Sequence, residues 1–126
     1  MAFDIINPAT GEKVNSFEEM SASEVQSILE LSAGAQREWA ATSFAERARL
    51  MLSVARVLRD NKEEYARLMT EEMGKVYPQG IAEVEKCAWG CEYYAEHAEA
   101  FLASEDVPTE AERSFVTYKP LGVVLA

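Results

Sequence analysis

The sequence predicts a mostly α-helical chain that forms part of an incomplete α/β fold. Three observations support this fold class: a β-hairpin pattern opens the chain, apolar residues recur at helical period through its middle, and an unbroken apolar run closes it. The closing run, Leu121 to Ala126, is typical of a strand buried on both faces in a parallel sheet covered by helices. The remaining residues contain no second strand of this kind, so we expect the C-terminal strands to begin a sheet that this chain does not complete.

The first predicted element is a β-hairpin over residues 3–17. Phe3 to Ile6 is apolar and β-branched, and the Asn-Pro and Gly of the segment Asn7 to Glu12 favour a turn. The residues from Lys13 to Phe17 can then run back beside the first strand.

Three long helices are predicted in the middle of the chain. Ser21 and Glu24 have the spacing of a capping box, which marks a helix start, and Ser43 with Glu46 repeats it. Gly74 suits a helix C-cap. The apolar stripes between these signals place the helices at about residues 23–41, 43–73 and 78–103, with a point of interruption in the second at Asp60–Asn61.

The segment after the helices is predicted to be a loop followed by strands. Residues 104–113 are polar and contain Pro108, which favours a loop. Strand-forming residues predict a strand over about 114–119, where Pro120 limits pairing to one side, and a second strand over about 121–126.

Composition restricts the partners of the chain. Its 126 residues carry a net charge of −10, so no basic surface is available to neutralise the phosphates of a nucleic acid. No apolar stretch approaches the length of a membrane span, and the N-terminus lacks the pattern of a signal peptide. We therefore expect a cytoplasmic protein that binds neither nucleic acid nor membrane.

The residues alone indicate no active site. Cys87 and Cys91 lie one helical turn apart, and without a further ligand nearby we interpret them as free thiols rather than as a metal site or a disulfide. His97 is interpreted as a partly exposed helix residue. The Gly74-Lys75 pair lacks the remaining residues of a phosphate-binding loop, and the dinucleotide fingerprint is absent.

Several short segments nevertheless resemble a known enzyme family. They are INPATGEKV in the hairpin, Trp39 followed by Ala45-Glu46-Arg47, EEMGK at 71–75, AEVEK at 82–86, YYAEHAE at 93–99 and YKPLGVVLA at 118–126. In this order and spacing they resemble the N-terminal quarter of an NAD(P)-dependent aldehyde dehydrogenase. The combination of AEVEK, YYAEH and PLGV is most similar to the bacterial succinate-semialdehyde dehydrogenase branch.

The resemblance implies a mechanism whose residues lie outside this chain. In the family a Cys thiolate attacks the aldehyde, a backbone amide and an Asn hold the oxyanion, hydride passes to nicotinamide, and a Glu activates water. These groups and the Rossmann-like sheet belong to later parts of the fold, so Cys87 and Cys91 are not expected to be the nucleophile. We expect the full-length enzyme to be a homo-oligomer and to bind NAD or NADP. We expect no cofactor to bind this chain alone.

Two sets of site residues follow from the resemblance. The backbone carbonyls of Ile5 and Ile6, with the carboxylate of Glu72, match a monovalent-cation site, since hard cations prefer oxygen ligands. A solvated Glu at a helix end is the alternative interpretation. The second set borders the aldehyde entrance tunnel, where Lys86 is suited to attract a carboxylate-bearing aldehyde; an ordinary surface helix gives the same pattern. This tunnel set comprises Lys86, Trp89, Gly90 and Tyr93.

Two hypotheses for the chain remain open at this stage. It is the N-terminal portion of an aldehyde dehydrogenase and inactive alone, or it is a non-enzymatic helical module that pairs with another chain through its C-terminal strand.

Overall fold

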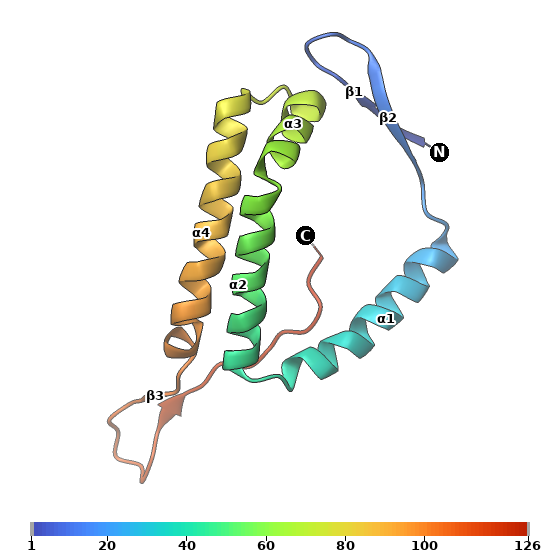
Figure 1. Cartoon of the computed structure of the whole chain (residues 1–126). Helices are drawn as coiled ribbons and strands as arrows, with labels where there is room; N and C mark the ends of the chain where they lie inside the picture. The colour runs from blue at the N-terminus through green and yellow to red at the C-terminus, as the bar shows by residue number, and fades with distance from the viewer. Residues whose placement is uncertain (1, 126) are drawn as a thin grey trace.

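The computed structural model describes residues 2–125 and confirms a mostly helical chain with strands near both ends. Figure 1 shows α2 and α3 running beside α4, whereas α1 stands apart from them. The elements in chain order are β1 (Ala2–Ile6), β2 (Lys13–Glu18), α1 (Ala22–Ala40), α2 (Phe44–Asp60), α3 (Lys62–Met73), α4 (Tyr77–Phe101), β3 (Glu105–Asp106) and β4 (Phe115–Val116).

The predicted N-terminal hairpin is confirmed. β1 pairs with β2 in antiparallel register from Ala2 opposite Glu18 onward. The Asn7 side chain closes the turn by accepting a hydrogen bond of 2.9 Å from the backbone N–H of Ala9. Gly11 adopts a φ of 75°, a left-handed conformation that favours glycine.

Both predicted helix starts are confirmed. Ser21 and Glu24 form the reciprocal capping box at the start of α1. The Ser43 hydroxyl accepts a hydrogen bond of 3.1 Å from the backbone N–H of Glu46 at the start of α2. Each cap satisfies a donor that the first helical turn leaves unpaired.

The second predicted helix, over 43–73, is divided in the structure. α2 ends and α3 begins at Asn61, whose φ of −115° and ψ of 17° are not helical. The carbonyl of Val57 accepts hydrogen bonds from both the Asn61 side-chain amide, at 2.8 Å, and the Asn61 backbone N–H, at 3.1 Å. Gly74 ends α3 in a left-handed conformation, as expected of a C-cap.

The core lies where α2 and α3 pack along α4. Ala55 of α2, Ala66 of α3, and Val84 and Ala88 of α4 are buried. Gly80 permits the close approach of α3 and α4, because a Cβ placed there would lie 3.1 Å from the Cβ of Ala66. Small side chains on facing sides therefore let these helices pack closely.

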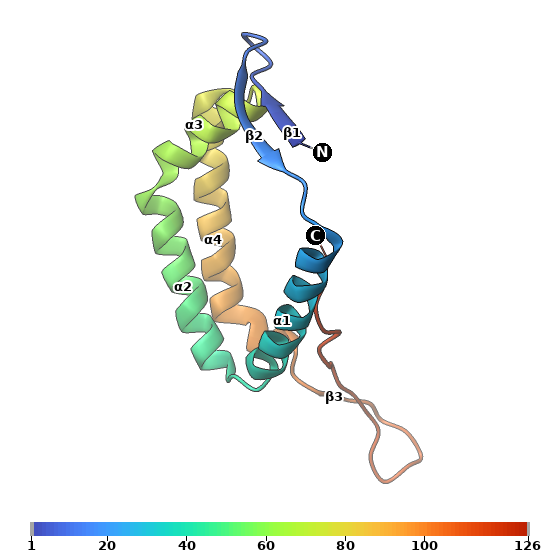
Figure 2. The ribbon, with the colours of Figure 1, turned by 90° about the vertical axis from the view of Figure 1, so that its right-hand side faces the viewer.

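The C-terminal segment differs from the prediction in two ways. The predicted loop over 104–113 contains β3, which pairs with β4 and extends as an arm away from the helices (Figures 1 and 2). The strand predicted over 114–119 shortens to Phe115–Val116, and residues 121–125 form no strand. A strand needs a neighbour to pair its backbone groups, and the described residues offer this segment none. Ala126, also in the predicted strand 121–126, lies outside the described residues.

The remaining surfaces are largely exposed. α1 contributes no buried residue, and Val123 of the C-terminal segment lines an open groove with Trp39 and Leu50. Across residues 2–125 the helices are too short or too polar to cross a membrane.

Candidate functional site

The outward face of α4 carries a row of aromatic rings. Trp89, Tyr93, His97 and Phe101 recur every four residues, so their side chains lie on one side of the helix. Ring centroids are 6.1 Å apart for Trp89 and Tyr93, 4.4 Å for Tyr93 and His97, and 5.9 Å for His97 and Phe101. Val84, on the opposite face, is buried against the other helices. We call these four residues the aromatic row.

The predicted tunnel residues fall partly within this row. Trp89 is 62% exposed and Tyr93 39% exposed, and their rings are in contact. Lys86 is exposed on the same helix and Gly90 is half-buried. Sequence reasoning missed His97 and Phe101 as members of the row, although their spacing of four residues from Tyr93 was the available signal.

Charged side chains of α2 and α3 form ion pairs with α4 near the aromatic row. The Arg59 guanidinium donates to both carboxylate oxygens of Glu92, with Nη2 to Oε2 at 2.8 Å, and its Nε donates to Glu85 at 3.1 Å. Lys62 Nζ donates to the other oxygen of Glu85 at 2.7 Å. Because Arg59 lies in the last turn of α2 and Lys62 is the first residue of α3, this cluster connects the break between those helices to α4.

The cluster shifts the titration of its members. Hydrogen bonds from Lys62 and then Arg59 lower the pKa of Glu85, and the hydrogen bond from Arg59 lowers the pKa of Glu92. The hydrogen bond to Glu85 raises the pKa of Lys62. These hydrogen bonds therefore favour the charged forms of Glu85, Glu92 and Lys62.

A second ion pair lies at the start of α4. Lys75, in the connection after Gly74, pairs with Glu83. This contact ties the α3–α4 connection to the second turn of α4.

The candidate cation ligands come from two elements near one another. Ile5 and Ile6 flank a register shift in the hairpin, where Val14 of β2 is an extra residue that interrupts regular backbone pairing. The hairpin turn touches the end of α3, because a Cβ at Gly74 would lie 2.9 Å from Cγ of Pro8. Glu72 is half-buried in the last turn of α3. Carbonyl and carboxylate oxygens suit a hard monovalent cation, so the donor chemistry fits this ligand.

Cysteine and histidine do not assemble a metal centre in the described chain. Cys87 is exposed, Cys91 is half-buried, and both thiols are free. Within residues 2–125 no three His, Cys, Asp or Glu side chains converge in a way that suits a metal ion.

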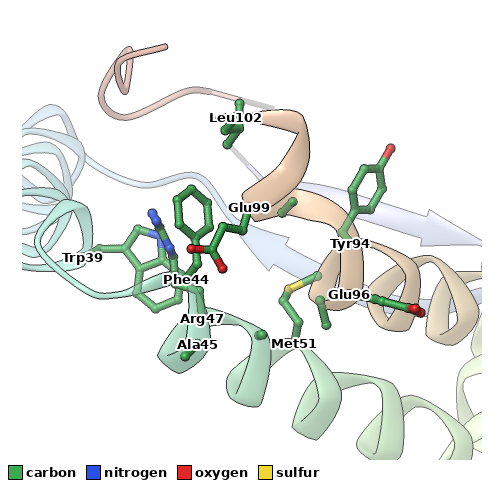
Figure 3. Close-up of a pocket in the computed structure, with 12 residues that line it drawn as sticks. Trp39, Phe44, Ala45, Arg47, Met51, Tyr94, Glu96, Glu99 and Leu102 are labelled. Atoms are coloured by element: carbon green, nitrogen blue, oxygen red, sulfur yellow. The ribbon is translucent and has the colours of Figure 1, made fainter. Parts of the chain in front are cut away.

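A pocket of about 400 Å³ lies at the other end of α4 (Figure 3). It is mostly apolar, and its walls come from α2, α4 and the end of α1. The Arg47 guanidinium lies over the Phe44 ring, 4.5 Å from its centroid. None of the predicted site residues lines this pocket. Its larger side chains include Trp39, Phe44, Arg47, Met51, Tyr94 and Leu102.

Comparison with known proteins gives the family. The whole chain, residues 1–126, matches the aldehyde dehydrogenase family. It is 46% identical over its full length to a probable succinate-semialdehyde dehydrogenase [NADP(+)] of Synechocystis sp., covering 28% of that protein. It is 39% identical over 96% of its length to a succinate semialdehyde dehydrogenase [NAD(P)+] of Escherichia coli, covering 26% of that protein.

Solved structures agree with this relationship. The succinic semialdehyde dehydrogenase of Streptococcus pyogenes, in complex with NADP+, superposes with a TM-score of 0.85 at 29% identity over 91% of this chain and 26% of that one. The succinate-semialdehyde dehydrogenase of Burkholderia pseudomallei gives a TM-score of 0.79 at 26% identity, over 90% of this chain and 24% of the other. The chain thus spans about a quarter of the length of the relatives it matches. The resemblance drawn from its sequence motifs is confirmed, and the chain belongs to the aldehyde dehydrogenase family.

Proposed function

We propose that this chain is part of an enzyme that oxidises succinate semialdehyde, or a similar small aldehyde, to the acid with NAD or NADP. The observation that carries the proposal is the 46% identity, over every residue of the chain, to a probable succinate-semialdehyde dehydrogenase. The cofactor follows from the names of the relatives, which specify NADP(+) or NAD(P)+.

The chain alone is inactive in this proposal. The resemblance assigns the nucleophilic Cys, the oxyanion-binding Asn and the water-activating Glu to the remainder of the fold, together with the dinucleotide site. That remainder is the first partner of the chain, and the full enzyme is a cytoplasmic homo-oligomer.

Two sites within the chain contribute to the full enzyme. The tunnel set of Lys86, Trp89, Gly90 and Tyr93 borders the path of the aldehyde, and exposed rings suit its apolar part. The carbonyls of Ile5 and Ile6 with Glu72 hold a monovalent cation, supported by the register shift between Ile5 and Ile6 and the contact of the hairpin with α3.

The proposal is tested in two steps. The purified chain, mixed with succinate semialdehyde and NADP, is expected to give no absorbance of reduced nicotinamide; measurable reduction would contradict its inactivity. Replacing the matching residues of the Synechocystis relative with this chain is expected to preserve oxidation of succinate semialdehyde. A folded chimera that oxidises other aldehydes but rejects this one would remove the substrate assignment.

A non-enzymatic binding module remains the second candidate, supported by the exposure of the C-terminal apolar segment. Leu121 and Leu125 are 97% and 98% exposed, which suits pairing with another chain. This role predicts a discrete dimer or hetero-complex in light scattering, whereas a part of a larger fold is expected to form no discrete complex and to bind a hydrophobic dye at its exposed apolar segment.

A further inference from the structure

The only lysine of α4 lies in a helix whose other charged residues are acidic. The helix contains Lys86, no arginine and five glutamates. A helical lysine pairs most readily with a carboxylate three or four residues away. For Lys86 the one acidic residue at such a position is Glu83, since the others are Ala82, Trp89 and Gly90. Helix geometry therefore predicts a Glu83–Lys86 pair on the surface of α4.

The structure shows a different pairing. Glu83 is bound by Lys75 from the α3–α4 connection. Glu85, beside Lys86 in sequence, is bound by Lys62 and Arg59. Within residues 2–125 no carboxylate lies at ion-pair distance from Lys86, whose side chain is exposed. A cation from outside α4 has thus taken up the one carboxylate that helix geometry places beside its lysine.

We propose that Lys75 is a positioning residue that keeps Lys86 available for the carboxylate of an anionic aldehyde. By holding Glu83, Lys75 weakens the competing pair within α4. This inference rests on the proposed function, because it explains how the tunnel set distinguishes a carboxylate-bearing substrate from an uncharged one.

The neighbours of Lys86 suit the remainder of such a substrate. Trp89 and Tyr93 follow it by three and seven residues, so all three side chains lie on one side of the helix. The Trp89–Tyr93 ring pair offers an apolar surface on the side of the helix that carries Lys86. A short carbon chain with a terminal carboxylate can contact both features at once.

The test measures anion binding by the 126-residue chain. Succinate is the charged probe, and succinamide is the uncharged control of similar shape. Binding is followed by NMR shifts of the Lys86 side chain and the Trp89 indole. We expect succinate to shift both signals and succinamide to leave Lys86 unchanged, and Lys86→Gln to abolish the preference for succinate.

Four further measurements separate positioning from folding. Lys75→Met is expected to weaken succinate binding roughly two-fold, the size of competition from one exposed helix pair. Glu83→Gln alone is expected to change nothing, because Lys75 already holds Glu83. The double variant Lys75→Met/Glu83→Gln is expected to restore binding, which a structural defect caused by losing Lys75 would not allow. Circular dichroism checks that each variant keeps its helix content.

The inference is overturned if Lys75→Met leaves succinate binding unchanged, or if the double variant stays as weak as Lys75→Met. It is also overturned if succinate and succinamide shift Lys86 equally. Each result leaves the proposed function intact when the Synechocystis chimera still oxidises succinate semialdehyde, so the two failures are distinguishable.

Discussion

Two regions of this chain differ sharply in how much they bury. The helical unit, formed by α2, α3 and α4, contains the four buried apolar residues of the described chain and the ion pairs of Arg59 and Lys62. The flanking segments, which are the hairpin, α1 and residues 117–125, contain no buried residue. Figure 2 shows α1 separated from α2 and α4 over most of its length.

The difference shows that an amphipathic pattern does not by itself bury a helix. α1 has apolar residues at helical spacing, yet Val25, Ile28 and Leu29 are each 44% or more exposed. The helical unit buries its apolar face because its partners lie within the same stretch of sequence. In our proposal the partners of α1 belong to the remainder of the enzyme.

The largest effect is expected from a charge placed in the core of the helical unit. Ala88→Asp buries an unpaired carboxylate between α4 and its neighbours, which is expected to cost about 3 kcal/mol or more and to abolish cooperative unfolding. Ala82→Asp places the same side chain on the exposed side of α4 and serves as the control. Urea unfolding followed by circular dichroism measures both; equal effects of the two variants would show that α4 is not packed as described.

Removing a helix cap is expected to affect the stability of the helical unit and of α1 differently. Ser43→Ala removes the cap of α2 and is expected to destabilise the helical unit by about 1 kcal/mol, lowering its unfolding midpoint. Ser21→Ala removes the equivalent cap of α1, where the loss is expected to fray that helix locally. Helix content would then fall without a change in the midpoint. A midpoint lowered equally by Ser21→Ala would mean that α1 unfolds together with the helical unit.

Features set by neighbouring residues were predictable from the sequence. The hairpin turn, the caps at Ser21 and Ser43 and the end of α3 at Gly74 depend on contacts within a few positions. The break at Asn61 was visible only as a point of interruption in the apolar stripe, because the non-helical backbone of this one residue separates α2 from α3. The lost strand at 121–125 was not predictable in this way, since strand formation depends on a partner.

The candidate site also has features that could be predicted from the sequence and features that could not. The tunnel residues were taken from the family resemblance, and the structure shows two of them, Trp89 and Tyr93, in contact on one side of α4. The pairing of Lys75 with Glu83 was not predicted, because it depends on the path of the α3–α4 connection. Whether the tunnel and cation residues act as proposed stays a prediction.

Glycine-to-alanine substitutions in α1 and α4 compare the two regions through smaller changes in stability. A Cβ at Gly34 of α1 or at Gly90 of α4 would meet no atom within 4 Å, so alanine fits both positions without a clash. Each change is expected to stabilise its helix by about 0.5–1 kcal/mol. Only Gly90→Ala is expected to raise the unfolding midpoint of the helical unit, whereas Gly34→Ala is expected to raise helix content alone. Thermal unfolding by circular dichroism decides; a higher midpoint for Gly34→Ala would indicate that the two regions are coupled.

The smallest expected effect concerns the ion pairs that hold α2 and α3 to α4. Contacts with Lys62 and Arg59 lower the pKa of Glu85, and contact with Arg59 lowers that of Glu92, from an ordinary value of 4.5. A carboxyl group whose pKa falls on folding contributes stability that is fully present above the unfolded value and is lost as pH falls through the folded value. Arg59→Met is therefore expected to lower the urea midpoint at pH 7 and to have a smaller effect near pH 3.

Arg56→Met, at an exposed position of α2, is the control and is expected to change little at either pH. The effect of Arg59→Met is expected to be modest because its partners are more than a third exposed and remain accessible to water and salt. A loss of stability that is the same at both pH values would show that Arg59 acts through the packing of its aliphatic chain and not through its ion pairs with Glu85 and Glu92.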